Sequence, residues 1–204
     1  MTRNQSSNPT VYVVDDDASI RRAIELLMRS VGQKCEIFSS GAEFLNEYRS
    51  GGVGCLVLDI RMPGMSGLEV QARLASVGDP MPIIFITGFA DVPMAVAAMQ
   101  KGAFDFIEKP FRDQELLDQI GAALLADDAR CSQQYNQQRV AECLKSLTNR
   151  ERQVMDLVVT GKPNKIIAHE LDVSQRTVEI HRARVMEKME ARSLADLVRM
   201  SFSI

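Results

Sequence analysis

The chain has 204 residues, of which 46% are hydrophobic and 25% are charged, a balance that is typical of globular proteins and excludes wholesale disorder. The net charge of −3 is unevenly spread, because the residues from Thr148 to Ile204 carry ten basic and eight acidic side chains, a net +2, while the remainder carries −5. This length and this asymmetry favour two domains with different partners.

No apolar run approaches the roughly 20 residues that a membrane helix needs, so we expect no membrane partner. The polar start MTRNQSSNPT does not resemble a secretory signal, and the sequence contains no CxxC pair. Scattered cysteines argue against a zinc site and against a disulfide scaffold. We therefore expect a protein of the reducing cytoplasm. The cysteines are Cys35, Cys55, Cys131 and Cys143.

Short apolar runs alternate with amphipathic stretches over residues 1–125. Apolar residues recur with helical spacing after Ile20, Leu68 and Val92. Strands alternating with helices indicate an α/β domain, a doubly wound parallel sheet of five strands with its functional groups at the carboxyl ends of the strands. The strands are expected at Val11–Val14, Cys35–Phe38, Cys55–Leu58, Ile83–Ile86 and Phe104–Ile107.

Residues 126–146 are predicted to form a helical linker. Apolar residues become sparse in this segment and Gln recurs, but neither Pro nor Gly interrupts it. Flexible linkers are usually rich in Gly, Ser or Pro, so a helix is the favoured interpretation and a disordered linker is the alternative.

Residues 147–204 have a helical pattern throughout and are predicted to form a small all-α domain. Thr148 begins a capping-box sequence at the start of one helix. A short helix at Asn164–Leu171 precedes a turn and a longer helix that Ser174 caps, which are the proportions of a helix-turn-helix. Ser193 is the expected cap of a final helix.

Acidic side chains follow two strands of the predicted sheet. Asp15, Asp16 and Asp17 come after the first strand, and Asp59 comes after the third. Carboxylates gathered at one sheet edge repel one another unless a cation is present, and oxygen ligands at a shallow edge suit Mg²⁺. For Asp17, which directly precedes a predicted helix, capping of that helix is the favoured interpretation.

A hydroxyl group and an ammonium group are expected at the same edge. Thr87 ends the fourth strand and Lys109 follows the fifth. If each residue is considered alone, Thr87 is expected to form a hydrogen bond in a turn, and Lys109 is expected to have a solvated side chain. Taken together with the carboxylates, two donors beside a metal suit a carboxylate that gains negative charge, as in an acyl phosphate.

The segments VVDDD, LDIRMPGMSG, ITG and EKPF resemble the receiver domains of two-component response regulators, over about residues 9–125. The resemblance implies a flavodoxin-like fold in which Asp59 accepts a phosphoryl group from the phosphohistidine of a sensor histidine kinase. It also implies that Mg²⁺ binds to Asp15, Asp16, Asp59 and the backbone carbonyl of Arg61.

The same resemblance implies a switch. Thr87 and Lys109 would contact the phosphoryl group, and Phe106 matches the switch aromatic of the family, with a plain core residue as an equally good interpretation. The reshaped face, residues 92–101 and 104–107, would then form a homodimer.

The helix that Ser174 caps carries small and apolar residues on the face that is expected to be exposed to solvent. Val178, Val185 and Met189 share the expected core side. The opposite side carries Arg176, Ile180, Ala183 and Glu187, flanked by Glu179 and Arg184. Small and apolar residues on an exposed face suit the major groove of DNA, where an apolar side chain can meet a thymine methyl group.

The stretch from Leu147 to Met189 resembles the LuxR-type helix-turn-helix of the FixJ/NarL regulators. The resemblance implies a transcriptional response regulator whose phosphorylated homodimer binds a pseudo-palindromic operator in double-stranded DNA. It further implies an activator with RNA polymerase as a partner. The DNA-contacting residues carried over are Lys165, Arg176, Thr177, Glu179, Ile180, Arg182, Arg184 and Lys188.

Two other functions stay open at this point. A phosphatase-like hydrolase could use Asp59 as its nucleophile, but such enzymes usually carry an acid two residues later, where Arg61 stands. A DNA-binding regulator with a vestigial acidic pocket is the second. We expect no turnover of an external substrate, only slow self-dephosphorylation, and we hypothesise that Phe89, at a position where His is common in the family, slows that loss.

Overall fold

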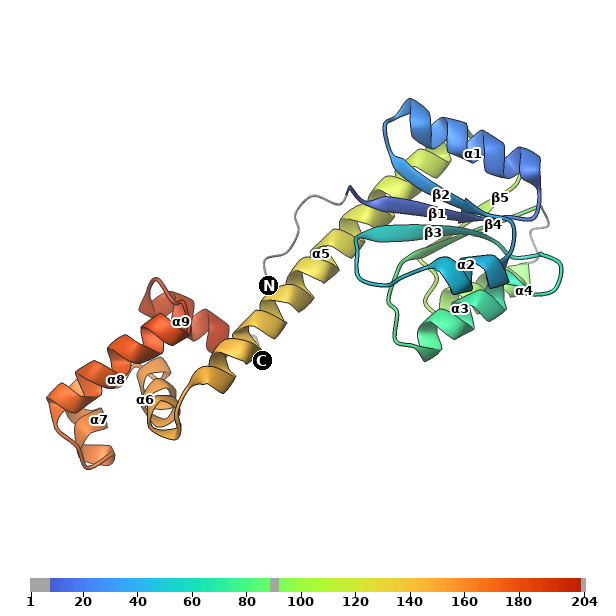
Figure 1. Ribbon diagram of the computed structural model, residues 1–204. Helices are drawn as coiled ribbons and strands as arrows, with labels where there is room; N and C mark the ends of the chain where they lie inside the picture. Colours follow the sequence, from blue (N-terminus) through green and yellow to red (C-terminus); the bar gives the residue numbers. More distant parts are fainter. Residues whose placement is uncertain (1–7, 89–91, 203–204) are drawn as a thin grey trace. The chain divides into compact units, whose positions relative to one another are not determined.

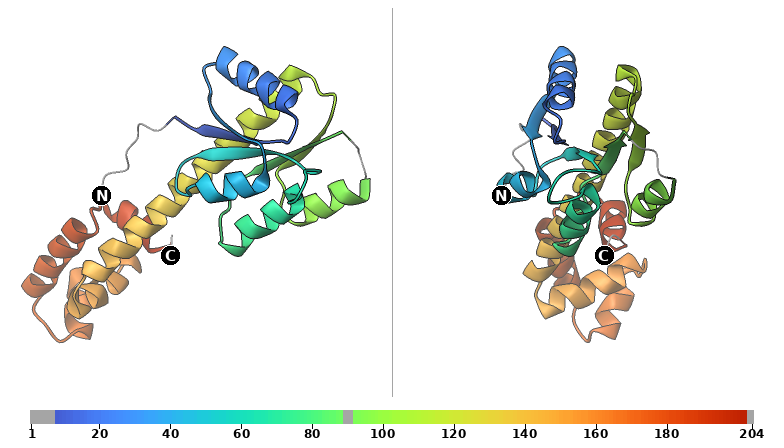
Figure 2. Two further views of the ribbon diagram at one scale, coloured as in Figure 1. Left: turned by 45° about the vertical axis from the view of Figure 1, so that its right-hand side comes forward. Right: turned by 90° about the vertical axis from the view of Figure 1, so that its right-hand side faces the viewer.

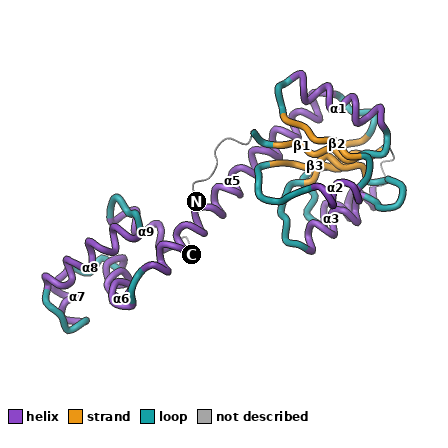
Figure 3. The backbone as a smooth tube through the Cα atoms, in the orientation of Figure 1, coloured by secondary structure: helices purple, strands orange, loops and turns teal. Residues whose placement is uncertain are grey.

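The computed structural model describes residues 8–88 and 92–202. It divides into two compact units, Met1–Cys131 and Ser132–Ile204 (Figure 1). The described strands all lie in the first unit, and the second unit consists of helices and their connecting turns, as the colouring by secondary structure shows (Figure 3).

The first unit contains the predicted parallel sheet. Its strand order is β2-β1-β3-β4-β5, and every neighbouring pair is parallel. Because β1 and β3 are neighbours, the residues that follow them meet at one edge of the sheet. Asp59 is the last residue of β3, opposite Ile86 of β4. The strands are β1 (Thr10–Val14), β2 (Lys34–Phe38), β3 (Gly54–Asp59), β4 (Ile83–Thr87) and β5 (Asp105–Glu108).

Helices cover both faces of this sheet, which confirms the doubly wound α/β fold. One buried cluster joins the sheet to α1 (Ala18–Ser30) and α5 (Asp113–Ser146). The other joins it to α2 (Gly41–Glu47), α3 (Gly67–Ser76) and α4 (Val92–Gln100). The rotated views show the same two layers (Figure 2).

The helix α2 is absent from the sequence prediction. It spans seven residues, too few to show a helical period clearly. Its N-terminal signal is the Ser40 hydroxyl, which accepts a hydrogen bond from the backbone N–H of Glu43. The ring of Phe44 anchors it in the core, where the side chain is fully buried.

The second unit is built from the end of α5 and four further helices. Val140 and Leu144 of α5 pack in the same buried cluster as Val154 and Ile167. The predicted caps are confirmed, since Thr148, Ser174 and Ser193 each accept a backbone hydrogen bond at a helix start. These helices are α6 (Asn149–Val159), α7 (Asn164–Glu170), α8 (Gln175–Lys188) and α9 (Leu194–Ser201).

The predicted linker, residues 126–146, lies entirely within α5. Its first turn belongs to the first unit, because the buried carboxylate of Asp127 accepts from the backbone N–H of Gly54 at 3.0 Å and pairs with Arg130 at 2.7 Å. Residues 133–139 are exposed. Among the described helices, α5 included, none is long and apolar enough to cross a membrane.

Candidate functional site

Three carboxylates meet at the edge of the sheet, as the sequence predicts. Asp15 follows β1 and is fully buried, Asp16 beside it is exposed, and Asp59 at the end of β3 is 6% exposed. One oxygen from each of these residues lies within 4.8 Å of the others. Oxygen donors alone, part buried and part open to water, are the ligand chemistry that a hard divalent cation such as Mg²⁺ prefers, so the residues present fit that ion.

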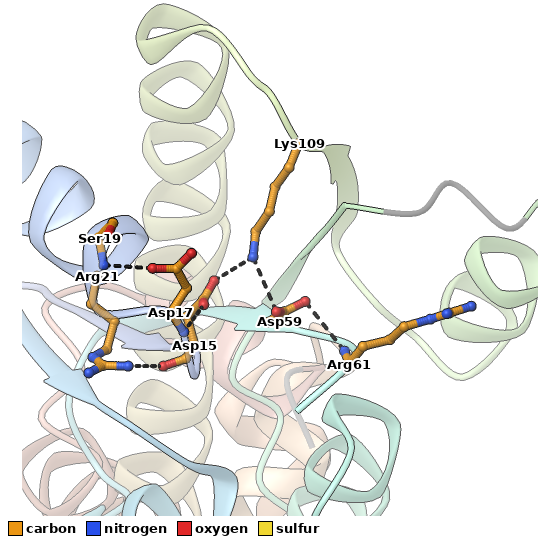
Figure 4. Close-up of polar contacts among 7 residues, drawn as sticks. All are labelled: Asp15, Asp17, Ser19, Arg21, Asp59, Arg61 and Lys109. Carbon is orange, nitrogen blue, oxygen red and sulfur yellow. Dashed lines mark hydrogen bonds and ion pairs between the residues drawn. The ribbon is translucent and has the colours of Figure 1, made fainter. Parts of the chain in front are cut away.

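The ammonium group of Lys109 lies between two of these carboxylates (Figure 4). Its Nζ is 2.6 Å from Asp15 Oδ2 and 3.1 Å from Asp59 Oδ2. The pKa of Asp15 is raised because the carboxyl group is buried, although the hydrogen bond from Lys109 acts in the opposite direction. Burial alone would lower the pKa of Lys109, but the contacts with Asp15 and Asp59 outweigh it and the pKa is raised. Lys109 is therefore charged and offsets the repulsion between the two acids.

Asp17 is a helix cap, in agreement with the interpretation that the sequence favours. Its carboxylate accepts from the backbone N–H of Ser19 at 2.7 Å at the start of α1, and this bond lowers the pKa of Asp17. Its own backbone N–H donates to Asp15 Oδ1 at 2.8 Å. Asp17 thus supports the carboxylate cluster from outside it.

The guanidinium of Arg21 is a support that sequence reasoning missed. Its Nη1 donates to the backbone carbonyl of Asp15 at 2.5 Å (Figure 4). Hydrogen bonds from Ser39 lower the pKa of Glu43, and the guanidinium of Arg21 adds a smaller lowering. The signal that the sequence offers for this contact is the position of Arg21 one turn into α1, six residues after Asp15.

The loop after β3 packs closely behind Asp59. The backbone N–H of Arg61 donates to Asp59 Oδ1 at 3.3 Å. A Cβ atom on Gly67, the first residue of α3, would lie 2.3 Å from the backbone carbonyl oxygen of Asp59. Glycine is therefore required where α3 begins against the backbone of Asp59.

Thr87 and Phe106 belong to β4 and β5, the two strands that α4 connects in the chain. Thr87 ends β4 with 1% exposure, and its backbone carbonyl accepts from the backbone N–H of Lys109 at 2.7 Å. Phe106 of β5 is partly buried and packs on the cluster that includes α3 and α4. Phe89 and Ala90 lie outside the described residues.

The face of α8 has the predicted division. Val178, Val185 and Met189 are buried, with at most 2% exposure. Ile180 is 45% exposed and lies on the side of α8 opposite these buried residues. The other exposed residues of this face are Arg176, Glu179, Ala183, Arg184 and Glu187.

Three basic residues of α8 have partners within the second unit, and one of these pairs, Arg176 with Glu179 at 3.9 Å, lies within α8 itself. Arg182 Nη1 donates to Asn164 Oδ1 of α7 at 2.8 Å. Lys188 Nζ lies 2.7 Å from Glu151 and 3.1 Å from the carbonyl oxygen of Ser146. These contacts tie α8 to α6, to α7 and to the end of α5.

The remaining predicted DNA contacts lie at the starts of the two helices. Lys165, in the first turn of α7, is exposed. Thr177 is partly exposed in the first turn of α8, and its hydroxyl lies 2.8 Å from that of Ser174. Helix starts and exposed cations are groups that bind phosphate.

Two families match the two units. Residues 11–121 match the family described as response regulator receiver domain. Residues 145–201 match the family described as bacterial regulatory proteins, luxR family. Together these segments cover most of the chain.

Several similar proteins match this chain over nearly its whole length. Nodulation protein W of Bradyrhizobium diazoefficiens is 49% identical over 196 residues, which cover 96% of this chain and 86% of that protein. The transcriptional regulatory protein FixJ of the same species is 42% identical over 191 residues, which cover 94% of this chain and 93% of FixJ. The solved structure of the response regulator StyR superposes with a TM-score of 0.90 at 44% identity, covering 97% of this chain and 100% of that one.

Proposed function

This chain belongs to the transcriptional response regulators that join a receiver domain to a LuxR-type DNA-binding domain, and we propose that it couples phosphorylation of Asp59 to promoter binding. The observation that carries the proposal is the carboxylate cluster, in which one ammonium group contacts both Asp15 and Asp59. Buried acids facing one another are costly to keep, so their presence at a sheet edge favours a chemical role over a structural one.

In the proposed reaction Asp59 is the nucleophile. One of its carboxylate oxygens forms a bond to phosphorus while the P–N bond of the kinase phosphohistidine breaks, and the imidazole takes the electron pair. Asp15, Asp16, Asp59 and the backbone carbonyl of Arg61 would hold Mg²⁺, which when bound neutralises charge on the phosphoryl oxygens. The protein positions the reactants and does little covalent work beyond that.

Lys109 and Thr87 then bind the phosphoryl group. The ammonium of Lys109 pairs with one phosphoryl oxygen, and the hydroxyl of Thr87 donates to another. The backbone N–H of Lys109 donates to the backbone carbonyl of Thr87 at 2.7 Å. Because of this bond, the ends of β4 and β5 move together when the phosphoryl group binds. Phe106 follows by turning inward, and the face of α4 and β5 becomes the contact surface of a homodimer.

The dimer presents two copies of α8 to a pseudo-palindromic operator. Ile180 meets a thymine methyl group and Glu179 accepts from a cytosine amino group, while the cations near the helix starts bind phosphates. Arg182 and Lys188 act through their internal partners and position α8. The residues proposed at the DNA interface itself are Lys165, Arg176, Thr177, Glu179, Ile180 and Arg184.

We further propose that the bound dimer contacts RNA polymerase and activates transcription in the cytoplasm. The protein turns over no external substrate, and the phosphoryl group leaves Asp59 slowly. A phosphatase-like hydrolase lacks support, because the position two residues after Asp59 holds Arg61 and not an acid.

The test compares Asp59→Asn with the wild-type protein. The protein is incubated with Mg²⁺ and acetyl phosphate and assayed for phosphate uptake, for dimerisation and for mobility shift on a random operator library. We expect all three responses in the wild type and none in Asp59→Asn. Asp118→Asn, the same change on the exposed side of α5, is the control and should respond like the wild type. An Asp59→Asn variant that is still labelled would refute the assignment.

A further inference from the structure

The side chain of Gln71 connects α3 to the end of α4. It is 3% exposed and lies between the two helices. Its Nε2 donates to the backbone carbonyls of Ala98 and Lys101, each at 3.3 Å. Ala98 lies in the last turns of α4, and Lys101 is the residue after its final one. A side chain from α3 therefore binds the C-terminal end of α4.

This end of α4 is a well-defined turn. The carbonyl of Ala98 also accepts from the backbone N–H groups of Lys101 and Ala103, both at 3.1 Å. Gly102 has a φ of 85°, which allows the chain to reverse there. Carbonyls at a helix end have no partner four residues further along the helix. The amide of Gln71 donates to two carbonyls here, that of Lys101 and, as a third donor, that of Ala98. The reverse orientation of the amide is excluded because it would set Oε1 against two carbonyl oxygens.

The other half of the amide is unpaired. Among the described residues, Gln71 Oε1 has no hydrogen-bond partner although it is buried. A buried carbonyl without a partner disfavours the folded state. An apolar side chain of equal length, such as methionine, would fill this place without that penalty. What the glutamine adds at position 71 is therefore the contact that its NH₂ group makes with α4.

We propose that Gln71 is a positioning residue that pins the C-terminal end of α4 to α3, so that α4 pivots about this end when Asp59 is phosphorylated. The pin joins two elements that matter for the response. Gly67 starts α3 against the backbone of Asp59, at 2.3 Å from a built Cβ to the carbonyl oxygen. Val96 and Met99 of α4 are 48% and 44% exposed and lie within one turn of the pinned end.

If the C-terminal end of α4 is fixed, a small displacement of its other end has a defined effect on the dimer face. If one end of α4 is held, a movement that begins near Thr87 rotates the helix, and it places Val96 and Met99 in one defined arrangement. Without the contact from Gln71, the same movement shifts a loosely held helix. The conformational entropy lost when the dimer face becomes ordered then opposes dimerisation. This inference rests on the proposed phosphorylation of Asp59 and on the proposed dimer face.

The test uses Gln71→Met in the full chain. The control is Gln119→Met, the same change at a partly exposed glutamine of α5, which covers the opposite face of the sheet. Each protein is treated with beryllofluoride and Mg²⁺ as a phosphoryl analogue. We expect Gln71→Met to be labelled by acetyl phosphate as fast as the wild type and to have an equal or higher urea midpoint. Its dimer should nevertheless dissociate about tenfold more readily, as the loss of one to two hydrogen bonds implies.

A residue with a merely structural role would lower the urea midpoint and leave dimerisation of the folded fraction unchanged, which would overturn the proposal. So would an unchanged dimer in a stable variant. If Gln71→Met does not fold, amide exchange of the wild type decides. The amides of Lys101 and Ala103 should keep their protection on adding beryllofluoride, while those early in α4 change. Equal change at both ends overturns the pivot, and a wild type that takes up no phosphoryl group overturns the proposed function instead.

Discussion

At the scale of single residues, the acidic pocket depends on one internal cation. Asp15 is fully buried, and a carboxylate in that position needs a compensating charge. The ammonium of Lys109 supplies it while also contacting Asp59. A divalent ion bound to the same carboxylates would take over part of this role and release the ammonium for a phosphoryl oxygen.

Replacing Lys109 by methionine should therefore make the protein depend on magnesium. Without the ammonium, Asp15 and Asp59 repel each other, and we expect the free energy of unfolding of the receiver to fall by about 3 kcal/mol in the absence of Mg²⁺. Saturating Mg²⁺ should restore most of this loss, so it should stabilise Lys109→Met more than the wild type in urea unfolding. Lys101→Met, at an exposed position, is the control. Equal stabilisation of all three proteins by Mg²⁺ would contradict this role.

Gly67 is a second residue whose identity is fixed by a contact. A methyl group there would clash with the backbone carbonyl of Asp59 at 2.3 Å, and backbone cannot rotate away as a side chain can. We expect Gly67→Ala to lower the free energy of unfolding by about 2 kcal/mol and to slow phosphate uptake by displacing Asp59. Gly52→Ala is the control, since no atom lies within 4 Å of a Cβ built there. An alanine variant with wild-type uptake would show that the loop has room.

At the scale of elements, the start of α6 is held by a charged network. Glu151 completes the capping box with Thr148, and Lys188 of α8 lies 2.7 Å from its carboxylate. The bonds from Lys188 and from the backbone of Thr148 lower the pKa of Glu151 from 4.5 to about 2. Through Lys188, the cap at the start of α6 is connected to α8 and to the end of α5.

This lowered pKa has a predictable pH dependence. A carboxylate whose pKa is depressed on folding stabilises the protein above its unfolded pKa, and this contribution is lost as the pH falls from 4.5 to about 2. Glu151→Gln should be less stable at neutral pH and should lack that part of the acid loss. Urea unfolding of the second unit can be followed through the methyl signals of Ile167. Glu187→Gln, on the exposed face of α8, should retain the wild-type pH dependence; parallel curves for Glu151→Gln would exclude the link.

Features that are local in sequence could be predicted, and features made by tertiary contact could not. Strands, helix caps and the edge where Asp15 and Asp59 meet follow from short patterns and from the parallel topology. The short helix α2 escaped because seven residues show too little periodicity. The partners of Lys188 and Arg182 lie 37 and 18 residues away, and no pattern in the sequence points to them.

At the scale of the whole molecule, the charges of the two parts oppose each other. The residues before Thr148 carry a net −5 and the remainder +2, so the net charge of the whole chain does not favour DNA binding. Few cations are left for phosphates once Arg182 and Lys188 are paired internally. One copy should bind DNA weakly, and two copies on a pseudo-palindrome should double the number of phosphate contacts.

Dimerisation should therefore be visible in the salt dependence of DNA binding. Each phosphate contact contributes about −0.9 to the slope of log affinity against log salt concentration, so beryllofluoride should roughly double the slope of the wild type. Lys165→Ala removes one exposed cation per copy and should reduce the slope by about 1 without the analogue and by about 2 with it. Fluorescence anisotropy on an operator selected from the random library measures both slopes. An equal reduction in the two states would mean that one copy alone contacts DNA in the activated protein, and the proposed dimer on a two-fold operator would have to be abandoned.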